Sequence, residues 1–167
     1  MAAGLDWAVS NGMDVANLSL GGTSSSRVLH SAITSAHEAG VLLVVAAGND
    51  AISATKEFPA AYDGEVLTVS AYDVTGGVFA SFSNYGVPPI DVAAPGVGVC
   101  STTRGGSWGT MDGTSMASPH VAGAVALYLE NHPLADLNEV ENALKLGAVA
   151  LPDTIRHQEN LASVTSF

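Results

Sequence analysis

The apolar positions of this chain follow two rhythms, one typical of helices and one typical of buried strands. At residues 2–10, 26–39 and 114–129 they recur three and four positions apart, which predicts helices with an apolar face. Residues 41–47 form an unbroken apolar run, as expected of a strand buried on both faces of a parallel sheet. Residues 14–20 alternate between apolar and polar side chains, which predicts another strand. The order strand, helix, strand predicts one right-handed βαβ unit in this part of the chain.

Further strands and a last helix complete the predicted order of elements. Short strands are expected at residues 66–72, 91–94 and 97–102. Asp136 and Glu139 have the spacing of a capping box, so a helix is expected to begin there and to end at Gly147. Helices that alternate with strands predict an α/β domain with a mainly parallel sheet. Because no linker or repeat interrupts the pattern, residues 1–167 are interpreted as one domain.

The charge balance of the chain is strongly acidic and narrows the classes of partner. Five Lys and Arg residues stand against 16 Asp and Glu residues, which gives a formal net charge of −11. Such a surface argues against nucleic acid or an anionic membrane as a partner. A lysine-poor, acidic surface also suits a halophilic protein, which would fold better in molar salt because salt screens the repulsion. An ordinary acidic protein is an equally good interpretation.

The remaining composition says little about compartment. The chain has one cysteine, Cys100, so no internal disulfide is expected. No apolar run is long enough for a membrane span. The first residues lack the basic region and apolar core of a signal peptide, so no localisation follows.

The stretch with the clearest chemical meaning is residues 112–123, where a tight loop leads into the helix predicted at 114–129. Small residues separate its apolar ones, so we expect this helix to be buried on most sides. Pro119 has no N–H, which leaves the carbonyl of Ser115 without its usual helical partner. Ser115 lies at the positive end of the helix, where free N–H groups can stabilise developing negative charge, as a nucleophile requires. The alternative is an ordinary capping serine.

Asn49 follows directly after the buried strand at 41–47. In open α/β sheets, ligands bind beyond the carboxyl ends of the strands, so a substrate is expected near this side chain. Its amide NH₂ group is an uncharged donor suited to an oxyanion. The alternative is that Asn49 and Asp50 form a simple turn pair. Residues 17–22, Asn-Leu-Ser-Leu-Gly-Gly, are by themselves only a strand end with a glycine turn.

Three motifs in one order resemble the subtilisin-like serine proteases: residues 17–22, residues 44–49 and the string G-T-S-M-A-S-P-H-V-A-G at 113–123. The resemblance implies a three-layer α/β/α fold. It implies that Ser115 is the nucleophile and that Asn49 and the Ser115 N–H form the oxyanion hole. It also implies that the substrate is a peptide or protein and that the chemistry needs no cofactor.

The same resemblance implies the substrate-contacting residues. One wall of the pocket for the residue before the cleaved bond is expected from Ser19, Leu20 and Gly21, and the other from Ala46, Ala47 and Gly48. Glu57 lies where family members place the floor of that pocket, and a carboxylate there would favour Lys or Arg. A solvated loop carboxylate is the alternative for Glu57. Asp91 resembles an aspartate that binds a cation in some members, but one carboxylate makes a poor calcium site.

The base and the acid of the family's triad are not recognisable in this sequence. Neither the D-[ST]-G nor the H-G-T-H setting occurs, and none of the five histidines is a credible base for Ser115. We therefore expect the C-terminal part of a subtilisin-like catalytic domain, with the Asp, the His and the first strands of the sheet in an upstream segment. Two functions remain open. One is a serine endopeptidase fragment that is inactive alone, and the other is an inactive truncated relative that acts at most as a peptide-binding module.

Overall fold

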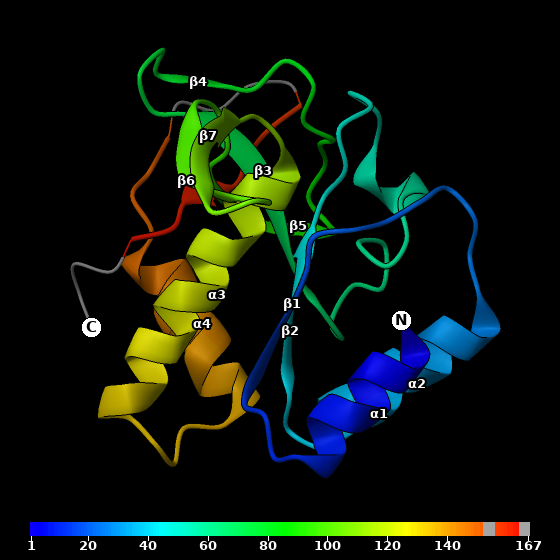
Figure 1. Cartoon of the computed structure of the whole chain (residues 1–167). Coiled ribbons are helices and arrows are strands. Elements are labelled where there is room, and N and C mark those ends of the chain that lie inside the picture. The colour runs from blue at the N-terminus through cyan, green and yellow to red at the C-terminus, as the bar shows by residue number, and fades with distance from the viewer. Residues whose placement is uncertain (152–155, 164–167) are drawn as a thin grey trace.

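The computed structural model describes residues 1–151 and 156–163, and it has the expected α/β architecture (Figure 1). A largely parallel sheet has the order β1-β2-β3-β5-β8, with β4 paired antiparallel to β3. Its strands are β1 (Val15–Leu18), β2 (Leu42–Ala46), β3 (Leu67–Asp73), β4 (Val78–Phe79), β5 (Ile90–Pro95) and β8 (Asn160–Leu161). The helices are α1 (Ala2–Ser10), α2 (Arg27–Glu38), α3 (Thr114–Asn131) and α4 (Leu137–Gly147), together with the short 3₁₀ helix η1 (Ala54–Lys56).

The helices lie in two layers, one on each face of the sheet (Figure 1). In β2, Leu43 and Val45 pack with α1 and α2, whereas Leu42 and Val44 pack with α3 and α4. This alternation explains why the run at 41–47 is apolar throughout, because a strand covered on both sides has no solvent face. The predicted three-layer α/β/α fold is confirmed.

Local signals fix the ends of the helices. Ser26 caps α2 by accepting a hydrogen bond from the backbone N–H of Leu29 at 3.3 Å. Asp136 and Glu139 form the predicted capping box of α4. None of the helices in the described part of the chain has the length and hydropathy that a membrane span requires.

Three expectations about the elements were wrong in detail. The strand predicted at 14–20 ends at Leu18, because the side chain of Ser19 turns to bond α3. The strand predicted at 97–102 is present as β6 (Val99–Thr103) with shifted bounds, and it pairs with β7 (Ser107–Met111) in a separate antiparallel hairpin. Strand β7 was missed because both of its faces are largely exposed, so it carries no alternation of apolar and polar residues.

Helix α3 is the third correction, because it is not buried on most sides. Val121 and Val125 are fully buried against the sheet, but Ala126 and Leu127 face solvent in the described structure. Strand β1, beside this exposed side, forms one edge of the sheet in the part of the chain that the structure describes. Some apolar side chains of α3 therefore have no packing partner in the part of the chain that the structure describes.

Candidate active site

The three segments singled out in the sequence meet at one end of the sheet. Residues after β1 and after β2 lie beside the first turn of α3, as expected when two parallel strands end at the same edge (Figure 1). Together they line a cavity of about 250 Å³. Its lining consists of Leu20, Gly21, Ala46, Gly48, Asn49, Asp50, Glu57, Thr114 and Ser115.

The amide of Asn49 is held in one orientation by the start of α3. The backbone N–H of Thr114 donates to Asn49 Oδ1 at 2.9 Å, and the Thr114 hydroxyl donates to the same oxygen at 2.9 Å. Because a backbone N–H can only donate, the oxygen of the amide must face Thr114. The Thr114 hydroxyl in turn accepts from the Gly48 N–H at 3.1 Å, which fixes its direction. The Nδ2 group of Asn49 is therefore turned away from Thr114 and remains available as a donor.

Two donors converge on the space beside Gly113, the residue before α3. A methyl group on Gly113 would lie 3.5 Å from Asn49 Nδ2 and 3.6 Å from the backbone nitrogen of Ser115. The Ser115 N–H belongs to the first turn of the helix, where no preceding carbonyl can accept it. Both N–H groups thus border one small space that glycine leaves open. An anionic oxygen in that space could accept from both, which is the arrangement of an oxyanion hole.

Pro119 has the consequence that the sequence predicted. The carbonyl of Ser115 receives no helical hydrogen bond from Pro119, and Ser19 Oγ donates to it at 2.9 Å instead. Ser118 Oγ donates to Asn17 Oδ1 at 2.7 Å and lies 3.1 Å from Ser19 Oγ. These bonds tie the end of β1 to the start of α3. The position of Ser115 is therefore set by side chains from another element and not by its own helix alone.

The residues expected to contact substrate divide into two groups. Leu20, Gly21, Ala46 and Gly48 line the cavity. Ser19 and Ala47 do not line it. The hydroxyl of Ser19 is engaged by α3, and Ala47 is fully buried beneath the site. Side chains on an extended segment point alternately to opposite sides, so neighbours in sequence cannot all face one cavity.

Asn84 is a positioning residue that the sequence did not reveal. Its side chain is fully buried, and Nδ2 donates to the Ala47 carbonyl at 2.8 Å. Oδ1 accepts from the N–H groups of Asp50 and Ile52 at 3.0 and 3.1 Å. These bonds hold the loop on both sides of Asn49. These bonds join residues more than thirty positions apart. The only signal in the sequence was that Asn84 is a polar residue in a segment without regular structure.

No histidine among the described residues is hydrogen-bonded to Ser115, whose hydroxyl donates to the Ser19 carbonyl at 3.4 Å. His120 borders a surface hollow of about 290 Å³ together with Ser115, but its Nδ1 lies 2.8 Å from the Met116 carbonyl in its own helix. His30 stacks on Tyr62 and pairs with Glu65.

Asp91, the candidate calcium ligand, is engaged by protein groups. Lys145 Nζ lies 2.8 Å from Oδ1, and the Thr68 N–H donates to Oδ2 at 2.8 Å. No cluster of three or more His, Cys, Asp or Glu side chains that could hold a metal occurs among the described residues. The carboxylate of Asp91 is thus already paired with Lys145 and the Thr68 N–H.

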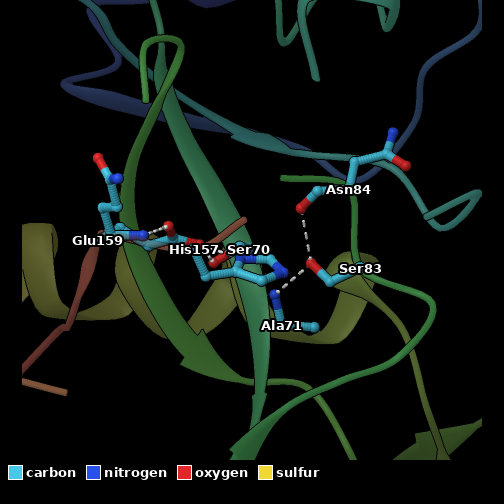
Figure 2. Close-up of polar contacts among 7 residues, drawn as sticks. Ser70, Ala71, Ser83, Asn84, His157 and Glu159 are labelled. Atoms are coloured by element: carbon cyan, nitrogen blue, oxygen red, sulfur yellow. Dashed lines mark hydrogen bonds and ion pairs between the residues drawn. The ribbon is translucent and has the colours of Figure 1, made fainter. Parts of the chain in front are cut away.

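A second polar cluster lies apart from the cavity and contains a serine, a histidine and a carboxylate. Figure 2 shows Ser70 of β3 near Glu159 and His157, which precede β8. Ser70 Oγ donates to Glu159 Oε1, and His157 Nδ1 lies 2.8 Å from the same oxygen. Although burial alone raises the pKa of Glu159, the hydrogen bonds from His157 and Ser70 outweigh it and hold that pKa below its ordinary value. The sequence analysis left this region uninterpreted.

Comparison with known proteins shows the family of this chain. The model of the subtilase family, peptidase S8, matches residues 1–162. Subtilisin DY of Bacillus licheniformis is 41% identical over 167 residues, covering 98% of this chain and 60% of its own length. Subtilisin BL of Lederbergia lenta is 46% identical over 154 residues, covering 92% of this chain and 56% of its own length. The chain thus spans less than two thirds of either relative.

Solved structures show the same likeness. A cold adapted subtilisin-like serine proteinase superposes with a TM-score of 0.90 at 35% identity, covering 99% of this chain and 60% of the other. The matches include both helical layers, the central sheet and all three segments that meet at Ser115. The chain therefore belongs to the subtilase family, and its α/β fold is that of the subtilisin-like proteases.

Proposed function

We propose that this chain is the nucleophile-bearing part of a serine endopeptidase. The observation that carries the proposal is that two nitrogen donors, Asn49 Nδ2 and the backbone nitrogen of Ser115, border the same small space beside Gly113 at the start of α3. A serine so placed attacks a carbonyl carbon while the carbonyl oxygen is stabilised as it becomes negative. The substrate class is a peptide or protein, and the reaction needs no cofactor.

The chemistry proceeds by acyl transfer. Ser115 Oγ bonds to the carbonyl carbon of the peptide, and its proton passes to a base. The carbonyl oxygen, now an oxyanion, accepts from Asn49 Nδ2 and the Ser115 N–H. The C–N bond breaks as the amine takes the proton from the base, which leaves an acyl group on Ser115. Water then attacks this ester with the aid of the same base, and the acid product leaves.

The proposal requires a base that the described residues do not place beside Ser115. A serine hydroxyl is a weak nucleophile at neutral pH and needs an imidazole or similar group to accept its proton. We therefore infer that a segment carrying the Asp and His of the family's triad completes the site. This chain alone is expected to be inactive.

The second candidate is a peptide-binding module without catalysis. It is favoured by the hydroxyl of Ser115, whose hydrogen bond goes to a backbone carbonyl and not to a base. The cavity and its donors would then bind a peptide carbonyl without cleaving it.

Hydrolysis of a chromogenic peptide by the purified chain, with and without an added family segment that carries the Asp and His, separates the two candidates. Turnover should appear only in the mixture and should vanish in Ser115→Ala. Asn49→Ala should lower it by about a hundredfold, a scale taken from the loss of one such donor in subtilisin itself. An assembled mixture that binds peptide without cleaving it would favour the binding module.

A further inference from the structure

The cavity beside Ser115 contains a buried carboxylate without a partner. Glu57 directly follows η1, and it is only 5% exposed. Its Oε2 atom is inaccessible to solvent and has no hydrogen-bond partner. An unpaired buried carboxylate is costly, because the group has lost water without gaining a donor. Such an atom in a binding cavity points to a ligand that would supply the missing donor.

Two glycines from opposite walls of the cavity make room for this side chain. A methyl group on Gly21 would lie 2.5 Å from Glu57 Oε1, and one on Gly48 would lie 3.1 Å from Glu57 Cγ. A larger residue at Gly21 would displace the carboxylate, and one at Gly48 would press first on Asn84 and also on Glu57 Cγ. Glu57 therefore lies between the segment that follows β1 and the segment that follows β2, in the same cavity that Ser115 lines.

The charged residues that line the cavity are both acidic. Asp50 also lines the cavity, and none of the described residues that line it is basic. Burial, with a further contribution from the negative charge of Asp50, raises the pKa of Glu57 above its ordinary value. A cation placed in the cavity would lower the pKa of Glu57 again, because it would pair with the Glu57 carboxylate and offset the negative charge of Asp50.

We propose that Glu57 makes this site select peptides with Lys or Arg at the residue whose carbonyl reaches Ser115. A lysine ammonium or an arginine guanidinium supplies both the charge and the N–H donors that Oε2 lacks. Leucine and other apolar side chains would leave the carboxylate unpaired, and an acidic side chain would add repulsion. The inference rests on the proposed function only in taking Ser115 as the point that the peptide carbonyl approaches.

Binding rather than turnover tests the inference, so that it can fail independently of catalysis. Calorimetric titration of the full chain in 0.15 M salt, on the order of physiological ionic strength, would use capped tetrapeptides that differ only in a final Arg, Lys, Leu or Glu. We expect the Arg and Lys peptides to bind roughly tenfold or more tightly than the Leu peptide, and the Glu peptide to bind most weakly.

Glu57→Gln is the decisive variant, because it keeps the shape of the side chain and removes the charge. It should bring the affinity for the Arg peptide down to that for the Leu peptide, with little change for Leu. Asp50→Asn is the matched control. It changes the net charge equally but leaves Glu57 in place, so most of the preference should persist.

The outcomes are distinguishable. An undiminished Arg preference in Glu57→Gln, a preference for Leu or Glu, or the absence of binding by any peptide would overturn the inference. Equal losses in Glu57→Gln and Asp50→Asn would also overturn it, since they would indicate general attraction to an acidic surface. A preference that depends on Glu57 and persists in Ser115→Ala would support it, even if no mixture ever cleaves a peptide.

Discussion

Ser115 and Ser70 both lie among polar partners, but the two clusters differ in what their hydrogen bonds leave available. Ser70, Glu159 and His157 contain the side-chain types of a serine protease triad, yet Ser70 and His157 both bond to the same oxygen of Glu159. The histidine and the serine are therefore both engaged with the acid. Around Ser115, in contrast, the bonds fix the amide of Asn49, and Asn49 Nδ2 and the Ser115 nitrogen both border the space beside Gly113.

The difference teaches that the arrangement of the groups, and not their identity, makes a site chemically competent. The Ser70 cluster is buried and joins the segment before β8 to β3, so it contributes stability (Figure 2). The Ser115 cluster borders a cavity that Glu57 also lines, and Oε2 of Glu57 is buried there without a hydrogen-bond partner. A ligand in the cavity could supply the missing donor. Changes in the first should affect folding, and changes in the second should affect binding or catalysis.

The largest expected effect on stability follows from removing Glu159. Glu159→Ala leaves Ser70 and His157 buried without their shared acceptor, so the free energy of unfolding should fall by about 3 kcal/mol. Because the folded pKa of Glu159 lies below its ordinary 4.5, this contribution is present above that pH and is lost as the pH falls through the lowered pKa.

Urea unfolding of both proteins across a pH series measures this effect. Ser115→Ala is the matched control and should change stability by less than about 0.5 kcal/mol. Equal losses in the two variants would remove the distinction between a structural and a functional cluster.

A smaller loss of stability is expected from replacing Asn84, which is both a buried structural residue and a residue that positions the loop of Asn49. Asn84→Ala leaves the N–H groups of Asp50 and Ile52 without their acceptor, at a cost of about 2 kcal/mol. The loop that carries Asn49 should also loosen, so peptide affinity should fall as well. Asn131→Ala, which removes an exposed amide at the end of α3, is the control and should leave both quantities unchanged. A loss of stability without a loss of affinity would show that Asn84 does not position the site.

The smallest effect, of opposite sign, is expected at Glu57. Its folded pKa is raised above its ordinary 4.5, so the folded protein holds this proton more tightly than the unfolded chain does. The stability of the unmodified protein therefore falls as the pH rises from that value through the raised pKa. Glu57→Gln should gain about 1 kcal/mol at neutral pH and almost nothing in acid, where Glu57 is already neutral. Thermal unfolding across the same pH series measures this gain, and a gain of the same size at every pH would contradict the assignment.

The sequence predicted those parts of the site that depend on local pattern. The apolar run of β2 placed Asn49 at the end of a buried strand, and Pro119 predicted that the Ser115 carbonyl would lack its usual helical partner. The strand order placed Asn49 at the carboxyl edge of the sheet, whereas its meeting with Ser115 was implied only by the resemblance to the subtilisin-like proteases.

The remaining features depend on contacts between distant residues, which no local pattern records. The roles of Asn84 and Glu159 arise from hydrogen bonds to elements far away in the chain. Ser19 was expected in the cavity wall but bonds α3, because an extended segment turns alternate side chains to opposite sides. The β6–β7 hairpin is largely solvent-exposed and so lacks a one-sided apolar pattern.

The central claim, that Ser115 is a nucleophile awaiting its base, is tested most directly by mapping where a fluorophosphonate probe attaches. The probe is applied to the chain alone and to the chain assembled with a family segment that carries the Asp and His, and the labelled peptide is found by mass spectrometry. We predict little labelling of the lone chain and strong labelling at Ser115 in the assembly, with none at Ser70. Rapid labelling of the lone chain, or labelling at Ser70, would contradict the account.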